Sequence, residues 1–560
     1  MQCIICFVCF FVSALTQTQK EFEQEPPTTA LRTTYCSDMG TTSTAPNGTV
    51  GNYLPRSFFF NNLLLWLFVS AHTFVAKEFV DVIVDEPYMD EVFHVNQTQR
   101  FCEIFNKGAG QWTVKDLVDS YDPKITTPPG PYLFASAYSI NVLKDKACSL
   151  GSIRSMNVVF NAGTVVVLSA LLERFYRRSS NANHILRICF LALSPVHFFF
   201  AFLFYTDSGS TFFVVLTYYM SMKINLAVLA KPSPTFARDW LVGLFLPVAL
   251  CSLFGFVSLW FRQTNIVWFG FVIGATVLRA TSERSLEESD RTGTSVSGEG
   301  VSPVDGLVAE LLDVLMSILG AIKYAVGDAR AFAFGAISLV PPVAVIAAFA
   351  AFLKWNDMSI VLGDKEHHVP VFHVPQLYYF VLYVMLPFNF SMVSEHGVMN
   401  IVNAMMSISL KTMLLTFLFI VWTIHTCTKV HPFILADNRH YTFYIWSKVM
   451  RHSVVRYALA VVYMFCGTQL VARIASVKRS LWAIGFVLCT CAVLVPAHLV
   501  EFRYWVIPSI FVNLHLLQKR EIPYLALAVF SYILGNAALV YIFLFRPFQM
   551  ESGQQGRFMF

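Results

Sequence analysis

Runs of about twenty apolar residues recur along most of this 560-residue sequence. A helix needs about 20 such residues to cross the hydrocarbon core of a bilayer. Only 13% of the residues are charged, about half the share found in ordinary soluble proteins. The pattern excludes a soluble globular fold and predicts an all-α polytopic membrane protein with about 13 transmembrane helices, within a range of about 12–14. The predicted spans are 57–76, 152–172, 185–205, 209–230, 240–260, 264–280, 331–353, 375–393, 401–426, 453–474, 480–500, 503–518 and 521–546.

Polar stretches divide the chain into four predicted parts. Residues 1–55 are interpreted as a disordered or targeting extension, because they are rich in Thr, Pro and Glu after a short apolar start. Residues 56–280 form a predicted N-terminal transmembrane module that contains the polar loop 77–151. Residues 281–330 are interpreted as a low-complexity loop that ends in an amphipathic helix. Residues 331–560 form a predicted C-terminal transmembrane module.

Alternating the spans from a cytosolic N-terminus separates the loops into two sets. One set is mostly short and basic, as expected of cytosolic loops, and it also receives 281–330. The other set is therefore predicted to face a lumen, and its first loop carries more Asp and Glu than Lys and Arg between residues 77 and 130. The remaining loops of the lumenal set are 205–209, 261–265, 363–376, 431–444 and 501–505.

Cysteine usage leaves one question open. Most of the 12 cysteines lie inside apolar runs, where a free thiol behaves as a small hydrophobic group. Cys102 and Cys148 instead flank the polar part of the first loop. They could pair if that loop faces an oxidising lumen, and otherwise they stay reduced.

The first candidate site is "DEPYMDEVFH" at residues 85–94. If the segment is helical, Asp90, Glu91 and His94 lie within one turn, and Asp90 shares a face with His94. A carboxylate at a membrane surface could accept a proton from an attacking hydroxyl. Two other interpretations remain open: a solvated or capping helix start, and a metal site completed by His368 or His373.

Two further groups of residues complete the candidate site. The stretch "YDPKITTPPGPY" at 121–132 is stiffened by its prolines, and it is either a connector or the wall of an acceptor site that includes Asp122 and Thr126. Arginines in lumenal loops could bind a phosphate group at the membrane surface. The alternative is that they pair with Asp437 or Glu501. The basic residues of the lumenal loops are Arg262, Lys365, His367, His368, His373, Arg439, His440 and Arg503.

One carboxylate beside a cationic pocket indicates a class of reaction. A lipid-phosphate sugar donor carries a leaving group that is already a stable anion, so it needs cationic stabilisation and no general acid. The acceptor hydroxyl needs one base. This differs from a glycosidase, which normally uses two carboxylates.

Seven sequence segments resemble the dolichyl-phosphate-glucose-dependent α-1,2-glucosyltransferases of the endoplasmic reticulum. They occur in that family's order over residues 86–560, and the fifth is a long and specific match. The segments are "EPYMDEVFHVNQTQRFC", "DPKITTPPGPYL", "FRQTNIVW", "GDKEHHVPVFHVPQLYYF", "LADNRHYTFYIW", "EFRYWVIP" and "GRFMF".

The resemblance implies a GT-C type transferase in the endoplasmic reticulum membrane, with short helices in its first lumenal loop and its active site facing the lumen. The implied reaction moves glucose from dolichyl-phosphate-glucose to a diglucosylated dolichyl-diphosphate-linked oligosaccharide, with inversion, and without a metal or other cofactor. The implied base is Asp90, with Glu91 second. The implied substrate-binding residues are His94, Asp122, Thr126, Arg262, His368, His373, Asp437, Arg439, His440 and Arg503.

Two alternatives are kept. Another dolichyl-phosphate-sugar-dependent transferase, such as a mannosyltransferase, would have the same architecture. A polytopic transporter is the second alternative, but transport sites lie near the bilayer midplane. The ionisable residues here cluster at the ends of the predicted spans on one side, which favours an enzyme.

Overall fold

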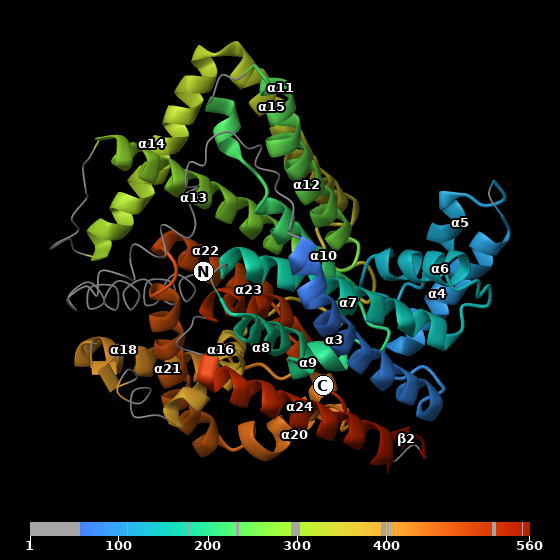
Figure 1. The fold of residues 1–560 in the computed structure, drawn as a ribbon. Coiled ribbons are helices and arrows are strands. Elements are labelled where there is room, and N and C mark those ends of the chain that lie inside the picture. The colour runs from blue at the N-terminus through green and yellow to red at the C-terminus, as the bar shows by residue number, and fades with distance from the viewer. Residues whose placement is uncertain are drawn as a thin grey trace.

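The structure is a computed structural model in which helices account for nearly all of the regular backbone (Figure 1). The prediction of an all-α polytopic membrane protein is confirmed. The described residues are 56–108, 110–176, 179–230, 234–292, 303–393, 399, 402–403, 405–406, 408–517, 522–550 and 553–560. The predicted extension 1–55 lies outside them.

The described residues of the first half of the chain form thirteen helical segments. In chain order they are α3 (Arg56–Ile83), α4 (Glu91–Asn106), α5 (Val114–Asp119), α6 (Gly130–Asn141), α7 (Leu150–Phe175), α8 (Asn181–Ala192), α9 (Pro195–Phe199), α10 (Asp207–Ser221), η1 (Leu226–Ala230), α11 (Phe236–Trp240), η2 (Leu241–Phe245), α12 (Leu246–Leu259) and α13 (Asn265–Thr292).

The second half adds further helices and one short hairpin. They are α14 (Pro303–Gly327), α15 (Ala329–Trp355), α16 (Pro375–Met385), η3 (Pro387–Val393), α18 (Leu410–Cys427), α19 (Pro432–Ala436), α20 (Tyr441–Ile445), η4 (Trp446–Met450), α21 (Ser453–Ala475), α22 (Ser480–Leu494), η5 (Phe502–Trp505), α23 (Val506–Leu516), α24 (Ile522–Phe545), β1 (Phe548–Gln549) and β2 (Gln555–Gly556). The strands pair antiparallel, with Phe548 opposite Gly556.

Seven helices among the described residues are long and apolar enough to cross a membrane. All thirteen predicted apolar runs coincide with helical segments, but several are divided into shorter helices. The run 185–205, for example, becomes α8 and α9, because the helix is interrupted before Ser194, the N-cap of α9, and Pro195 takes the first helical position. The span count of about 13 stays a prediction. The seven candidates are Leu150–Phe175, Asp207–Leu229, Phe236–Leu259, Ala329–Trp355, Leu410–Cys427, Ser453–Ala475 and Tyr524–Phe545.

The predicted loop 281–330 is largely helical. Its first residues continue α13 as far as Thr292, and its last part forms α14, the helix expected to be amphipathic. Glu310 of α14 accepts hydrogen bonds from the backbone N–H of Leu481 at the start of α22. A carboxylate there interacts favourably with the positive end of α22, so α14 is fastened to the C-terminal module.

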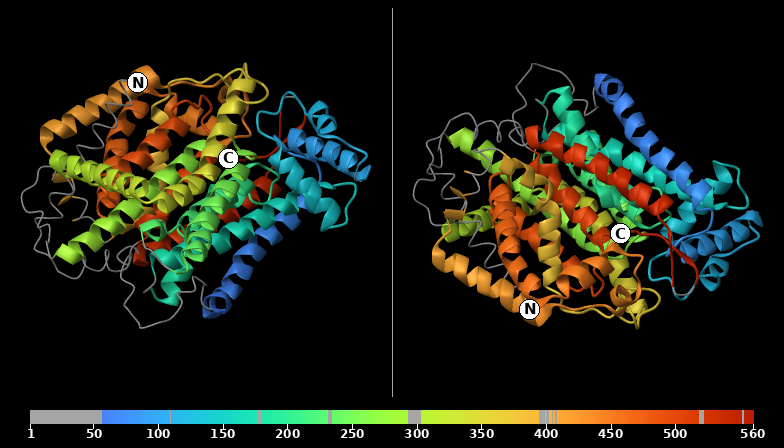
Figure 2. Two further views of the ribbon diagram at one scale, coloured as in Figure 1. Left: turned by 90° about the horizontal axis from the view of Figure 1, so that it is seen from above. Right: turned by 90° about the horizontal axis from the view of Figure 1, so that it is seen from below.

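The first polar loop folds into a lobe of short helices, α4, α5 and α6, at one end of the molecule (Figures 1 and 2). Helix α5 begins with a capping box between Thr113 and Asp116. A disulfide joins Cys102 of α4 to Cys148, just before α7. The pairing that the sequence left open is therefore formed, and it ties α4 to the start of α7.

Replacing Cys102 and Cys148 together by Ser is expected to destabilise this lobe by about 2–4 kcal/mol, because the disulfide closes a long loop. The sequence separation of the two residues is 46. Thermal unfolding of the detergent-solubilised protein measures the change, with Cys489→Ala, a free and partly buried cysteine, as the control. Alkylation of both lobe cysteines in native protein without a reductant would contradict the prediction.

Candidate active site

Asp90 stands at the junction between the lobe and the helix bundle. The chain leaves α3, passes Met89 in a left-handed conformation (φ 57°), and places Asp90 immediately before the first residue of α4. Non-glycine residues adopt such a φ only at some cost, so surrounding contacts must hold this turn. One such contact joins the backbone N–H of Asp90 to the hydroxyl of Tyr205 at 3.3 Å.

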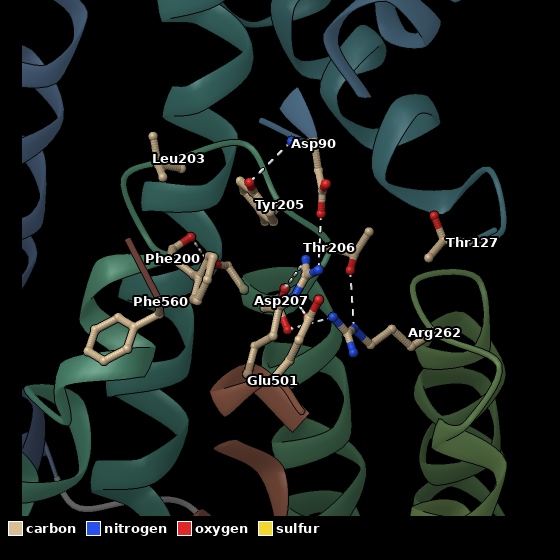
Figure 3. A network of polar contacts seen from close by, with 12 residues as sticks. Asp90, Thr127, Phe200, Leu203, Tyr205, Thr206, Asp207, Arg262, Glu501 and Phe560 are labelled. Carbon is tan, nitrogen blue, oxygen red and sulfur yellow. Dashed lines mark hydrogen bonds and ion pairs between the residues drawn. The ribbon is translucent and has the colours of Figure 1, made fainter. Parts of the chain in front are cut away.

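Arg503 connects three carboxylates around this point. Its Nη2 donates to Oδ2 of Asp90 at 3.0 Å, and its Nε donates to Glu501. Its Nη1 lies 3.9 Å from Oδ2 of Asp207. Three loops far apart in the sequence therefore meet at one guanidinium group. Figure 3 shows Asp90, Asp207 and Glu501 directed toward a common centre.

Arg262 enters the same centre from the loop between α12 and α13. Its Nη2 lies 2.9 Å from Oδ1 of Asp207, and its Nε donates to the hydroxyl of Thr206 at 3.1 Å. The ring of Tyr504 lies against its guanidinium group, 5.4 Å from centroid to Cζ. Two arginines thus face three carboxylates; Figure 3 shows Arg262 beside Asp207 and Thr206.

Tyr205 and Thr206 belong to buried irregular backbone between α9 and α10, and Asp207 is the first residue of α10. Buried carbonyl groups need hydrogen-bond partners. The side-chain amide of Asn157 donates to the carbonyls of Leu203 and Tyr205 at 2.7 and 2.8 Å. An asparagine inside α7, a candidate span, therefore fixes this part of the site.

Asp90 and His94 both have lowered pKa values, but for different reasons. Burial alone would raise the pKa of Asp90, but the charge of Arg503 and its hydrogen bond to the carboxylate outweigh burial and lower that pKa. The side chain of Asp90 is 42% exposed. Burial lowers the pKa of His94 to about 4, so this imidazole is neutral at pH 7, and its Nδ1 lies 2.8 Å from the hydroxyl of Tyr132.

Glu91, the other predicted base, is turned away from this centre and is completely buried. The guanidinium of Arg154 donates to both of its oxygens, at 2.9 Å (Nε to Oε1) and 2.7 Å (Nη2 to Oε2). The backbone N–H groups of Phe204 and Tyr88 add bonds of 2.6 and 3.1 Å. All four acceptor positions of the carboxylate are therefore used within the fold.

Arg154 also fastens the loop in front of Asp90. Its Nη1 donates to the carbonyl of Val84 at 2.8 Å, and its Nη2 donates to the carbonyl of Glu86 at 3.4 Å. The same Nη1 lies 3.1 Å from Oδ1 of Asp81 in α3. Sequence reasoning missed Arg154, because it stands three residues into an apolar run; an arginine in such a run was the signal that could have marked it.

The "LADNRHY" loop adds two more basic side chains. Arg439 makes a bidentate pair with Asp437, with both bonds at 2.8 Å, so Asp437 positions an arginine in the structure. The charge of His440 reaches Asp90 closely enough to help lower its pKa. The predicted residues His440 and Arg503 therefore lie near Asp90, and Arg439 precedes His440 in the same loop.

Other predicted residues lie outside this centre or at its edge. The backbone N–H of Asp122 is held by Gln97 at 2.9 Å, and its carboxylate accepts from the N–H of Lys124, as expected of a capped turn. The carbonyl of Thr126 accepts from Gln263, the neighbour of Arg262, at 2.8 Å. The proline-rich loop therefore borders the site.

His368 and His373 belong to a neighbouring loop region. His368 Nδ1 lies 3.1 Å from the carbonyl of Asp364. His373 is buried, and its backbone N–H donates to the carbonyl of Val495. Within the described part of the chain neither imidazole contacts Asp90, and no group of three His, Cys, Asp or Glu side chains is arranged to hold a metal ion.

The model of the DIE2/ALG10 family matches residues 84–514, which include all the site residues above. The chain belongs to the DIE2/ALG10 family. Curated relatives carry the name Dol-P-Glc:Glc(2)Man(9)GlcNAc(2)-PP-Dol alpha-1,2-glucosyltransferase. The relative from Rattus norvegicus is 32% identical over 488 residues, the one from Homo sapiens is 31% identical over 507, and the one from Arabidopsis thaliana is 28% identical over 529; the matches cover 85% of this chain and 93%, 93% and 95% of those proteins.

The family resemblance inferred from seven short segments is therefore confirmed. The match to the DIE2/ALG10 family covers the loops that carry Asp90, Arg262, Arg439 and Arg503. Asp207 and Tyr205, which sequence reasoning had not selected, lie in the same matched region.

Proposed function

We propose that this chain is an inverting GT-C type glucosyltransferase that moves glucose from dolichyl-phosphate-glucose to the diglucosylated dolichyl-diphosphate-linked oligosaccharide. The new bond is the terminal α-1,2-glucose of the N-glycan precursor. The observation that carries the proposal is the convergence of Asp90 with Arg503 and Arg262, in a chain whose relatives bear that activity in their names.

The reaction follows from this arrangement in one displacement. Asp90 takes the proton of the acceptor hydroxyl, whose oxygen bonds to the anomeric carbon of the donor glucose. The bond from that carbon to the phosphate oxygen breaks on the opposite face, which inverts the configuration. Dolichyl phosphate leaves with one additional negative charge, and Arg503, Arg262, Arg439 and His440 stabilise it.

Asp90 is the better candidate for the base than its neighbour Glu91. The Asp90 carboxylate is partly exposed and ionised at neutral pH, because Arg503 holds its pKa below the ordinary value. The Glu91 carboxylate has no free lone pair, since Arg154 and two backbone N–H groups use both oxygens. A base must reach the substrate, and only Asp90 can do so without disrupting its surroundings.

We place the site on the lumenal side of the endoplasmic reticulum membrane. The lobe that bears Asp90 carries the Cys102–Cys148 disulfide, and such bonds persist in oxidising compartments. The opposite set of loops is basic, as cytosolic loops are. Both observations support the same orientation.

Purified protein incubated with dolichyl-phosphate-glucose and the diglucosylated acceptor tests the proposal directly. The expected product is larger by one glucose, and that glucose is attached by an α-1,2 linkage. Glycan mass and linkage analysis measure both properties. The same acceptor with dolichyl-phosphate-mannose is the control. Transfer of mannose without transfer of glucose would assign the chain to another dolichyl-phosphate-sugar-dependent transferase.

Chelators are expected to leave the rate of glucose transfer unchanged. The reason is that arginine and histidine side chains can supply the positive charge that the leaving phosphate needs. The measurement is the initial rate with and without excess EDTA, with added Mg²⁺ and Mn²⁺ in separate reactions. A loss of rate that either cation restores would contradict the proposed metal-independent mechanism.

A further inference from the structure

The last residues of the chain return to the active site after leaving the helix bundle. Helix α24 ends at Phe545, the chain turns through the β1–β2 hairpin, and residues 557–560 then run beside the "LADNRHY" loop. Met559 forms a parallel bridge with His440. Its N–H donates to the carbonyl of Arg439, and its carbonyl accepts from the N–H of Tyr441, both at 2.9 Å.

Arg557 anchors this segment to the bundle and to the loop of Asp90. Its guanidinium donates to the carbonyls of Phe543 and Leu544, the last turn of α24, at 2.9 and 2.8 Å. The hydroxyl of Tyr88 donates to the carbonyl of Arg557 at 2.7 Å and accepts from its N–H at 2.6 Å. Tyr88 is two residues before Asp90, so its bonds to Arg557 help to hold the turn that positions the proposed base.

Phe560 contacts the site in two ways. Its carbonyl oxygen lies 2.8 Å from Nδ1 of His440. A carbonyl oxygen only accepts, so Nδ1 must carry the hydrogen. Nε2 lies 3.9 Å from Oδ2 of Asp437, which is too far for a hydrogen bond, and it can donate to a phosphate when the ring is protonated. The ring of Phe560 packs against Phe502, the residue before Arg503, with 5.5 Å between centroids; Figure 3 shows this ring together with the polar network.

We propose that residues 557–560 form a positioning segment of the active site. In it, Phe560 holds His440 so that Nε2 is available to the phosphate of the lipid donor. The inference rests on the proposed function. A segment that only stabilised the fold would not be expected to contact all three of these loops. Its contacts fall within two residues of Asp90, His440 and Arg503. Phe560 acts through His440 and is a positioning residue.

Phe560→Leu is the first test, and Phe558→Leu is its matched control. The control residue is two positions away in the same segment, but its ring packs against Phe548 and Tyr444. Phe560→Leu is expected to lower kcat/KM for dolichyl-phosphate-glucose roughly tenfold, because small displacements of a group that contacts the reacting atoms are costly. Phe558→Leu is expected to change it less than about twofold, and both variants should unfold at similar temperatures.

A double-mutant cycle separates positioning from general stability. In a His440→Gln background, Phe560→Leu should cost less than about twofold further, because the residue through which it acts is already altered. Binding of dolichyl phosphate by the same four proteins, measured with the purified enzyme in detergent, gives a second readout if turnover of the double variant is too slow. The binding losses should show the same lack of additivity.

Equal losses in the two phenylalanine variants, or a full tenfold loss in the His440→Gln background, would overturn the proposal. So would a His440→Gln enzyme with unchanged donor binding and turnover. These outcomes leave the proposed function standing, provided that the unaltered protein transfers glucose. Absence of any transfer by the unaltered protein would instead refute the function on which the inference rests.

Discussion

Asp90→Asn is expected to lower kcat for glucose transfer by a factor of about 10²–10⁴, the range associated with loss of a general base. Asparagine keeps the size of the side chain but cannot take the acceptor proton. Donor binding should persist, because the substitution frees Arg503 from its 3.0 Å bond to the carboxylate. The measurements are single-turnover rates at saturating substrates and donor affinity in the same preparation.

Asp85→Asn is the matched control for this variant. Asp85 is exposed in the same loop and has no hydrogen bond to the Arg503 network among the described contacts. Its activity should be close to that of the unaltered enzyme. Turnover of Asp90→Asn within about tenfold of normal would move the base to another residue.

The pH dependence provides a second check on Asp90. Its pKa is below the ordinary value for aspartate, so the base stays ionised as the pH falls from neutrality. The rate should therefore not decline for lack of base between about pH 7 and pH 5. Arg503→Met removes the neighbouring positive charge and should move the acid limb of the profile to higher pH, because the pKa of Asp90 rises.

Arg154→Met is expected to destabilise the protein by about 3–5 kcal/mol and to reduce the yield of folded material sharply. The substitution leaves the Glu91 carboxylate buried without its two guanidinium bonds and leaves the carbonyl of Val84 without its donor. Thermal unfolding and the monodisperse fraction in detergent measure the effect. Arg100→Met is the control, since that exposed side chain lies 4.0 Å from its acidic partner, and such pairs contribute about 0–1 kcal/mol.

The double variant Arg154→Met/Glu91→Gln tests the cause of that loss. If the uncompensated charge of Glu91 dominates, neutralising it should restore part of the stability lost in Arg154→Met. Activity per folded molecule should also return in part, because Asp90 is unchanged. A double variant that is destabilised by the sum of both single changes would show that the pair contributes nothing as a pair.

Much of the architecture could be predicted from the sequence. A helix in lipid needs a continuous apolar surface, and this requirement is visible as runs of apolar residues. Among the described residues each predicted run overlaps one or more helical segments, and the family followed from short segments such as "LADNRHYTFYIW". Helix breaks were less predictable. The buried irregular backbone between α9 and α10 depends on Asn157, which is supplied by another helix.

The sequence alone predicts a helical membrane protein with acidic and basic loops on one side, because charge and apolar length are local properties. The different surroundings of Asp90 and Glu91 depend on the tertiary structure. Adjacent residues at a helix start point about 100° apart, and which of them faces the site depends on where α7 places Arg154. A guanidinium that holds Glu91 inside the fold, and a second one that holds Asp90 at the centre, assign the two carboxylates their different roles.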